Sequence, residues 1–240
     1  MSVRFILNKN VDFKNCIFVS GFHGIGLTGF IAVKHLVESL NAERIGFVES
    51  DKLPPFVAMS DNGVSTPFEL YMYSKLVFLV VEISPSKEEQ YAFSRAVVDW
   101  VVQNGFSRAI LIGGLDNRFK KEDDGDSKFI CTSAFKRLFS VDERLLMDKG
   151  LYVFGLLASF LARFEMMNFP AIAVLPFAEA SRPDPNASAN AVKYINSVCN
   201  LDVSVSKLIE DAELIESEVK KLMHQWSEKT KSDKEKSLYM

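Results

Sequence analysis

The chain has 240 residues, of which 48% are hydrophobic and 25% are charged, and its formal net charge is −3. A chain of this length and composition can bury a full core, so we expect one domain with an appendage. The slightly acidic balance argues against a protein that binds nucleic acid through a basic surface. Cys16, Cys131 and Cys199 are too scattered for a disulfide framework and indicate free thiols in a reducing, cytoplasmic compartment.

The sequence predicts no membrane segment. Arg4, Lys9 and Asp12 interrupt any apolar run that could serve as a secretory signal. The most apolar stretch, residues 150–162, is 13 residues long, whereas a helix that spans a bilayer needs about 20 residues. We therefore predict a buried helix over this stretch and expect no membrane partner.

The apolar runs along the chain predict a layered α/β fold. Five continuous runs are typical of strands buried on both faces, namely residues 16–20, 45–49, 76–82, 109–113 and 171–175. Helical patterns lie between them, with N-terminal capping signals at Ser86 and Asp184. Leu53-Pro54-Pro55 interrupts this alternation, and Asn62-Gly63 predicts a type I′ hairpin. We expect residues 1–200 to form a three-layer α/β/α sandwich around a mixed, mostly parallel sheet.

A glycine-rich block follows the first predicted buried strand. It matches the dinucleotide fingerprint G-x-G-x-x-G at Gly24, Gly26 and Gly29. Glu49 lies 20 residues beyond Gly29, where a ribose-binding acid is expected. However, Gly21 occupies the turn that leaves the strand, and Phe22 and His23 lengthen that turn. The other interpretations are a turn that permits close packing of strand and helix, and a family signature with a different use.

Few residues have a pattern typical of catalysis. His35 and His224 fall on predicted helices, and only His23 lies in a predicted loop. The sequence has no G-x-S-x-G elbow and no histidine pair with the spacing of zinc ligands. The charged segment 116–128 is predicted to be a solvated loop rather than a calcium site. Glu49 and Glu82, at the ends of predicted strands, are the remaining carboxylate candidates. We expect no metal and no cofactor.

The C-terminal part of the chain differs in character. We predict an amphipathic helix over residues 201–227, with a heptad-like apolar seam at Leu208, Ala212, Ile215, Val219, Leu222 and Trp226. Such a seam packs either on its own domain or on another subunit of an oligomer. Residues 228–240 are predicted to be a flexible tail that ends in Leu238-Tyr239-Met240. An apolar pair and a free carboxylate after a polar stretch are typical of a terminus presented to a pocket.

Several of these motifs together resemble the proteasome assembly chaperone 2 family, in its archaeal-type branch, over roughly residues 1–200. The motifs are Gly21-Phe22-His23-Gly24-Ile25-Gly26-Leu27-Thr28-Gly29, Leu53-Pro54-Pro55, Pro67-Phe68-Glu69, the strand ending in Glu82, and Ile112-Gly113-Gly114-Leu115. The resemblance implies a fold similar to purine nucleoside phosphorylase, without established catalysis.

The resemblance also implies a use for the tail, because Leu238-Tyr239-Met240 is similar to the hydrophobic–Tyr–X (HbYX) terminus that docks between α-subunits of the proteasome core particle. Leu238 would fill an apolar pocket, Tyr239 would contact the gate-forming segments, and the Met240 carboxylate would pair with a lysine. We therefore expect a non-enzymatic, homo-oligomeric chaperone or ATP-independent activator. One alternative is a nucleoside phosphorylase-like or nucleotide-binding enzyme that uses the turn at residues 21–29. Another is a scaffold whose terminal helix binds a different protein.

Overall fold

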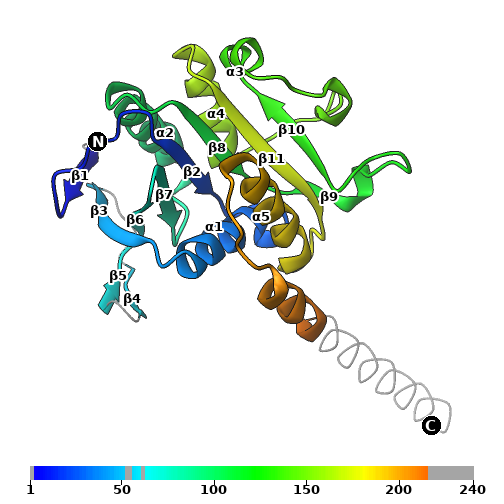
Figure 1. The fold of residues 1–240 in the computed structure, drawn as a ribbon, viewed down its shortest axis with the longest axis horizontal. Helices are drawn as coiled ribbons and strands as arrows, with labels where there is room; N and C mark the ends of the chain where they lie inside the picture. The colour runs from blue at the N-terminus through cyan, green and yellow to red at the C-terminus, as the bar shows by residue number, and fades with distance from the viewer. Residues whose placement is uncertain (1–2, 52–55, 61–62, 216–240) are drawn as a thin grey trace, which may run out of the picture.

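The computed structural model describes residues 3–51, 56–60 and 63–215 (Figure 1). Its main sheet has nine strands in the order β1-β3-β6-β7-β2-β8-β11-β10, and β9 also pairs with β11. These strands are β1 Val3–Leu7, β2 Ile17–Gly21, β3 Glu43–Ser50, β6 Phe68–Tyr73, β7 Leu76–Val81, β8 Arg108–Ile112, β9 Leu115–Asp116, β10 Ser127–Cys131 and β11 Ala171–Ala178. The helices are α1 Thr28–Ser39, α2 Lys87–Gln103, α3 Ser133–Leu138, α4 Leu156–Met166 and α5 Pro185–Cys199. Short 3-10 turns are η1 Ile25–Leu27, η2 Asn117–Phe119 and η3 Glu143–Leu145.

The predicted mixed sheet is confirmed, and the parallel strands lie at its centre. Strands β7, β2, β8 and β11 pair in parallel, and their continuous apolar sequences are typical of parallel strands that are covered on both faces. Every residue of β7 and of β11 is buried. The outer strands β1, β3, β6 and β10 pair antiparallel, so the sheet is less parallel than the apolar runs suggested.

Helices cover both faces of the sheet, which confirms the three layers (Figure 1). Helices α2 and α4 pack together on one face, where Phe93, Val97 and Phe160 are fully buried. Helices α1 and α5 pack together on the other face, where Leu36, Val192 and Ile195 are fully buried. Each helix therefore buries an apolar stripe against the sheet, which is the main source of stability of such a sandwich.

Local signals set most of the helix boundaries. The Asp184 carboxylate accepts a 3.0 Å hydrogen bond from the Ala187 amide, so it caps α5 as predicted. Ser86 precedes α2, but its side chain makes no capping hydrogen bond. The helix predicted over residues 150–162 begins only at Leu156, because Gly155 adopts a φ of 77° that a helix does not permit. Residues 150–155 form a loop instead.

Four strands of the main sheet, β1, β6, β9 and β10, do not coincide with a predicted run, because none of them is a continuous apolar stretch of the kind that marks the central strands. Strand β1 alternates half-buried and exposed residues at the edge of the sheet. Strand β10 begins inside the charged segment 116–128, at Ser127, although the sequence predicts a solvated loop there. Within it, Lys128 and Asp124 are each 8% exposed in their side chains and form an ion pair with an N–O distance of 2.5 Å. Mutual neutralisation lets these charges be buried beside β11.

The predicted hairpin is present as a small separate sheet of β4 Ala58–Ser60 and β5 Gly63–Ser65. Ser60 is paired with Gly63, so Gly63 belongs to a strand rather than to the turn. Asn62 and the break at residues 53–55 lie outside the described residues. The hairpin projects from the body of the molecule beside β6 (Figure 1).

The C-terminal seam is corrected in part. Residues 206–215 are helical, but Leu208 and Ala212 are buried in this chain's own core, at 3% and 2% exposure. The preceding segment is fixed to the domain, because His35 Nε2 lies 2.7 Å from the Ser204 carbonyl oxygen. Leu208 and Ala212 therefore pack on the parent domain and not on another subunit. Ile215 is half-buried.

The remaining seam positions Val219, Leu222 and Trp226 lie outside the described residues, as does the tail. No helix in the part of the chain that the structure describes is long and apolar enough to cross a bilayer.

Candidate functional site

The glycine-rich block joins strand and helix through direct backbone contact. A Cβ atom added to Gly21, the last residue of β2, would lie 1.9 Å from the Gly29 carbonyl oxygen. A Cβ atom added to Gly29 would lie 2.2 Å from the Ile112 carbonyl oxygen, at the end of β8. A Cβ atom added to Gly114 would meet the Ile25 carbonyl oxygen at 2.4 Å. These glycines therefore allow β2, α1 and the loop after β8 to meet at one point.

The packing around Gly26 argues against a dinucleotide at the start of α1. The Asp184 amide donates a 2.8 Å hydrogen bond to the Gly26 carbonyl. A Cβ atom added to Gly26 would lie 3.0 Å from the Cβ atoms of both Ala178 and Asp184. The segment that leads into α5 thus covers the helix end that a pyrophosphate would need. Gly24, the first glycine of the fingerprint, has no atom near its missing Cβ, so close packing does not require a glycine there.

Each of the two candidate carboxylates is paired with a cation. Glu49 lies on β3, which β6 and β7 separate from β2, and it pairs with Arg4 at 2.9 Å. A ribose-binding acid lies instead on the strand next to the glycine turn. Glu82 forms an ion pair with Lys34 of α1 at 2.8 Å. Both carboxylates are already neutralised by cations.

His23 packs against α1. The His23 ring stacks on the Phe30 ring, with their centroids 4.3 Å apart. Lys34 Nζ lies 5.6 Å from the centroid of the Phe30 ring. Burial lowers the pKa of His23, and the Glu82 carboxylate opposes that shift. The imidazole is therefore neutral at neutral pH. Its Nδ1 atom is buried without a hydrogen-bond partner among the described residues.

A cavity of about 590 Å³ lies beyond the carboxyl ends of β2 and β8. This is the edge of the sheet where open α/β folds place their sites. The predicted turn supplies Phe22, His23 and Gly24 to its wall, while Gly21, Gly26 and Gly29 shape the turn from behind. The opposite wall consists of residues 113–116 and 150–157, and Ser84, Gln90, Arg118 and Phe119 complete the lining.

The rim of this cavity carries exposed aromatic side chains. Tyr152 and Phe154 are 76% and 82% exposed, and their ring centroids are 6.3 Å apart. Phe119 is also exposed. We call these three residues the aromatic rim. Large exposed aromatic side chains at one place on a surface are typical of a contact with another protein.

The polar groups near the rim are paired with one another. Arg118 donates to the Asp116 carboxylate from Nε and Nη2, at 3.0 and 2.6 Å to Oδ2. These bonds hold the pKa of the Asp116 carboxyl below its usual range and that of Arg118 above it. Among the described residues, no hydroxyl or carboxylate is hydrogen-bonded to His23, and no group of side chains has the arrangement of a metal site. The arrangement suits protein contact better than acid–base chemistry.

Sequence reasoning missed the aromatic rim and the Asp116–Arg118 pair. The stretch containing Tyr152 and Phe154 was assigned to a buried helix because it is apolar. Gly150 and Gly155, both at positive φ, flank the loop and were the available signal. The predicted proteasome-binding residues Leu238, Tyr239 and Met240 lie outside the described residues.

The chain is similar to several known proteins. A model of the PAC2 family matches residues 18–223. An uncharacterized protein of Methanocaldococcus jannaschii is 26% identical over 250 residues, which cover 100% of this chain and 99% of that protein.

Two solved structures from Pyrococcus furiosus share the fold. PbaA, an archaeal homolog of proteasome-assembly chaperone, has a TM-score of 0.78 and 25% identity, over 95% of this chain and 99% of PbaA. PbaB, an archaeal proteasome activator, has a TM-score of 0.76 and 19% identity, over 92% of this chain and 98% of PbaB. The α/β fold predicted from the sequence is thereby confirmed.

Proposed function

This chain belongs to the PAC2 family, and from that premise we propose that it is a proteasome assembly chaperone or an ATP-independent proteasome activator. The observation that carries the proposal is the agreement of almost the whole chain with PbaA and PbaB. The segment that leads into α5 covers the N-terminal end of α1 beside Gly26, which supports a function that does not involve nucleotide binding. We propose that the protein acts in the cytoplasm, as a homo-oligomer, without cofactor or catalysis.

We place the contact with the proteasome core particle in Leu238, Tyr239 and Met240. Leu238 would fill an apolar pocket between two α-subunits. Tyr239 offers apolar area together with a hydroxyl group, which suits a contact with the gate-forming segments. The terminal carboxylate of Met240 would pair with a lysine of the pocket. Docking would either hold α-subunits during assembly or open the gate of the finished particle.

Oligomerisation would strengthen this contact. One short tail binds weakly, but several tails on one oligomer act at high effective concentration once the first has docked. Because Leu208 and Ala212 pack on their own domain, we propose that the aromatic rim contributes to the contact between subunits. The positions Val219, Leu222 and Trp226 remain a second predicted contact.

One observation favours the alternative of a small-molecule site, namely the cavity of about 590 Å³ at the carboxyl ends of β2 and β8. Its size lies within the range of about 300–1,000 Å³ that is usual for ligand pockets. Calorimetry with purine nucleosides and dinucleotides separates the two functions. Saturable binding of either ligand would favour an enzyme of the nucleoside phosphorylase or nucleotide-binding type.

The proposed function is tested by capture on immobilised proteasome. The full-length protein and a variant lacking residues 238–240 are compared on assembled core particle and on free α-subunits. We expect the truncated variant to lose capture while keeping the same oligomeric mass. Preference for free α-subunits would indicate assembly, and preference for the core particle would indicate activation. Equal capture of the truncated variant would contradict the role of the tail.

A further inference from the structure

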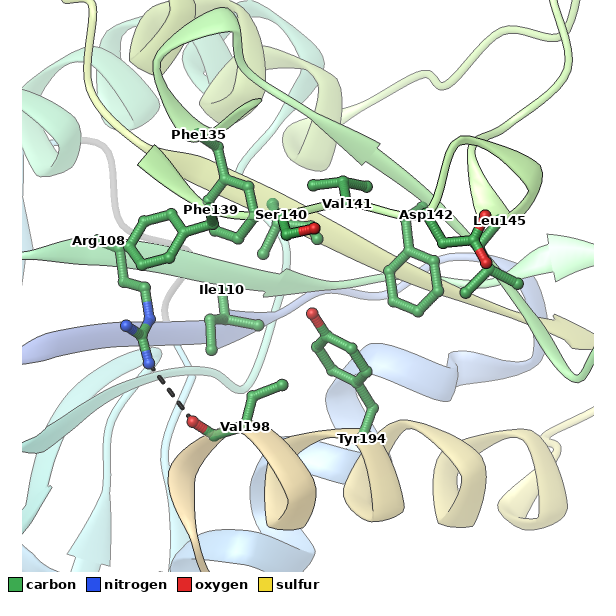
Figure 2. Close-up of a pocket in the computed structure, with 12 residues that line it drawn as sticks. Arg108, Ile110, Phe135, Phe139, Ser140, Val141, Asp142, Leu145, Tyr194 and Val198 are labelled. Carbon is green, nitrogen blue, oxygen red and sulfur yellow. Dashed lines mark hydrogen bonds between the residues drawn. The ribbon is translucent and has the colours of Figure 1, made fainter. Parts of the chain in front are cut away.

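A second cavity lies on the other side of the sheet and takes no part in the proposed function. Its volume is about 510 Å³, and it lies between α5, strands β8, β10 and β11, and the segment after α3 (Figure 2). Its walls are mainly apolar side chains: Ile110, Phe129, Phe135, Phe139, Val141, Leu145, Ile172 and Val198. Such a volume and lining are usual for a small-molecule site.

One end of this cavity carries an incompletely paired cation. Arg108, the first residue of β8, places its guanidinium 5.1 Å from the Phe139 ring centroid. Nη2 donates to the Val198 carbonyl oxygen over a long 3.4 Å. No carboxylate of the described residues forms an ion pair with Arg108. A guanidinium has five N–H donors, so most of its capacity is open to an occupant.

The other end of the cavity carries a carboxylate that is paired with a cation of the same segment. Figure 2 shows Asp142 and Leu145 at the end remote from Arg108. Asp142 is paired with Arg144, with 2.7 Å between Oδ2 and Nη2. The stretch between the two ends is apolar, apart from the Ser140 and Tyr194 hydroxyls. An occupant would therefore carry an anion at the Arg108 end and an uncharged tip at the Asp142 end.

The Tyr194 side chain directs its hydroxyl group into the cavity (Figure 2). Its ring packs against Phe129 with centroids 4.9 Å apart, and the hydroxyl points into the cavity (Figure 2). No hydrogen bond to it is drawn among the described lining residues. Burial raises the pKa of Tyr194, so the hydroxyl stays protonated and can donate to an occupant.

We propose that this cavity binds a medium-chain fatty acid, with its carboxylate on Arg108 and its alkyl chain along β8 toward Leu145. A carboxylate and a guanidinium form two parallel charge-assisted hydrogen bonds, which gives the head a fixed position. Burial of the alkyl chain against the aromatic walls supplies the rest of the affinity. The lining has few polar groups to pair with a peptide backbone, which favours a lipid over a protein terminus.

Titration calorimetry on the full-length protein with decanoate tests this proposal. We expect saturable binding of one decanoate per chain, and at least tenfold weaker binding of 1-decanol, which lacks the charge, and of decanedioate, which carries a second charge to Asp142. Arg108→Gln should weaken decanoate binding at least tenfold, and Arg108→Lys less. Val198→Trp should abolish binding by filling the cavity mouth.

Arg95→Gln, on α2 at the opposite face of the sheet, is the matched control and should bind decanoate normally. Thermal unfolding shows whether each variant is folded, and if Arg108→Gln is not, the comparison of decanoate with 1-decanol decides. Absence of saturable binding, equal binding of the acid and the alcohol, or unchanged binding in a folded Arg108→Gln would overturn the proposal. Tighter binding of a peptide of residues 231–240 would also overturn it and assign the cavity to a protein terminus.

Discussion

The carbonyl oxygen of Gly29 in α1 lies where a Cβ atom of Gly21 in β2 would have to be, at a separation of only 1.9 Å. Helix and strand therefore touch through their backbones at the point where the candidate cavity begins. The block at residues 20–29 has the residue types of a nucleotide-binding turn but is used for packing. Its glycines fix the position of Phe22 and His23 in the cavity wall.

Gly29→Ala should destabilise the domain by about 2–3 kcal/mol, because the added methyl group overlaps backbone atoms that cannot move aside. Gly24→Ala is the matched control. Its backbone is extended, with a φ of −157°, and a Cβ atom there meets nothing within 4 Å, so the change should be close to neutral. Urea denaturation of both variants measures the difference. Equal effects would contradict the packing role of the block.

Stability should depend on the protonation of His23. Because burial lowers the pKa of His23 in the folded state, the unfolded chain binds more protons below the ordinary histidine pKa of about 6.5. The free energy of unfolding should therefore fall as the pH decreases from 7.5 to 5.5. His23→Gln should make this decrease shallower. Denaturation of the two proteins at the two pH values measures the change, and identical slopes in both would contradict it.

Substitution of Leu208 tests whether the C-terminal seam packs on its own domain or on another subunit. Leu208→Ala should lower the free energy of unfolding by about 2–5 kcal/mol, because it opens a cavity in the chain's own core. Leu214→Ala, at an exposed position of the same helix, should have little effect. Denaturation is measured together with the oligomeric mass by light scattering. A Leu208→Ala protein that is fully stable but dissociated would restore this residue to a subunit contact.

The aromatic rim should contribute to association between subunits. Replacing Tyr152 and Phe154 together by serine removes two exposed rings from one surface, so the oligomer should dissociate at least tenfold more readily on dilution. Stability should change little, because neither ring is buried. Tyr91→Ser, an exposed position on α2, is the control. Light scattering across a dilution series measures the mass, and an unchanged series would exclude the rim from the contact.

Much of the fold could be predicted from the chain because its central strands are continuous apolar runs. The apolar runs at residues 76–82 and 171–175 are typical of strands in a doubly covered sheet, and β7 and β11 are buried throughout. Strand β10 could not be predicted in this way, because Lys128 looks solvated until Asp124 is known to be beside it. The antiparallel pairs β1–β3, β3–β6 and β10–β11 join segments that are far apart along the chain, which a local pattern does not encode.

The candidate site could be predicted only in part. The turn at Gly21 to Gly29 was found because its spacing is distinctive, and the loop after β8 was included through the family resemblance. The aromatic rim was not found, because an apolar segment has the same composition whether it is buried or exposed. Whether this segment is buried or exposed depends on the path of the chain around Gly155. That path is set by the positive φ of Gly155 and not by the hydrophobicity of the segment.

The central claim is that the last three residues bind the proteasome while the folded domain carries them. The most direct measurement is the affinity of Tyr239→Ala for the core particle, compared with the unchanged protein and with Ser237→Ala as the neighbouring control. We predict that Tyr239→Ala loses binding at least a hundredfold, that Ser237→Ala binds normally, and that all three proteins have the same oligomeric mass. Undiminished binding of Tyr239→Ala would contradict the account.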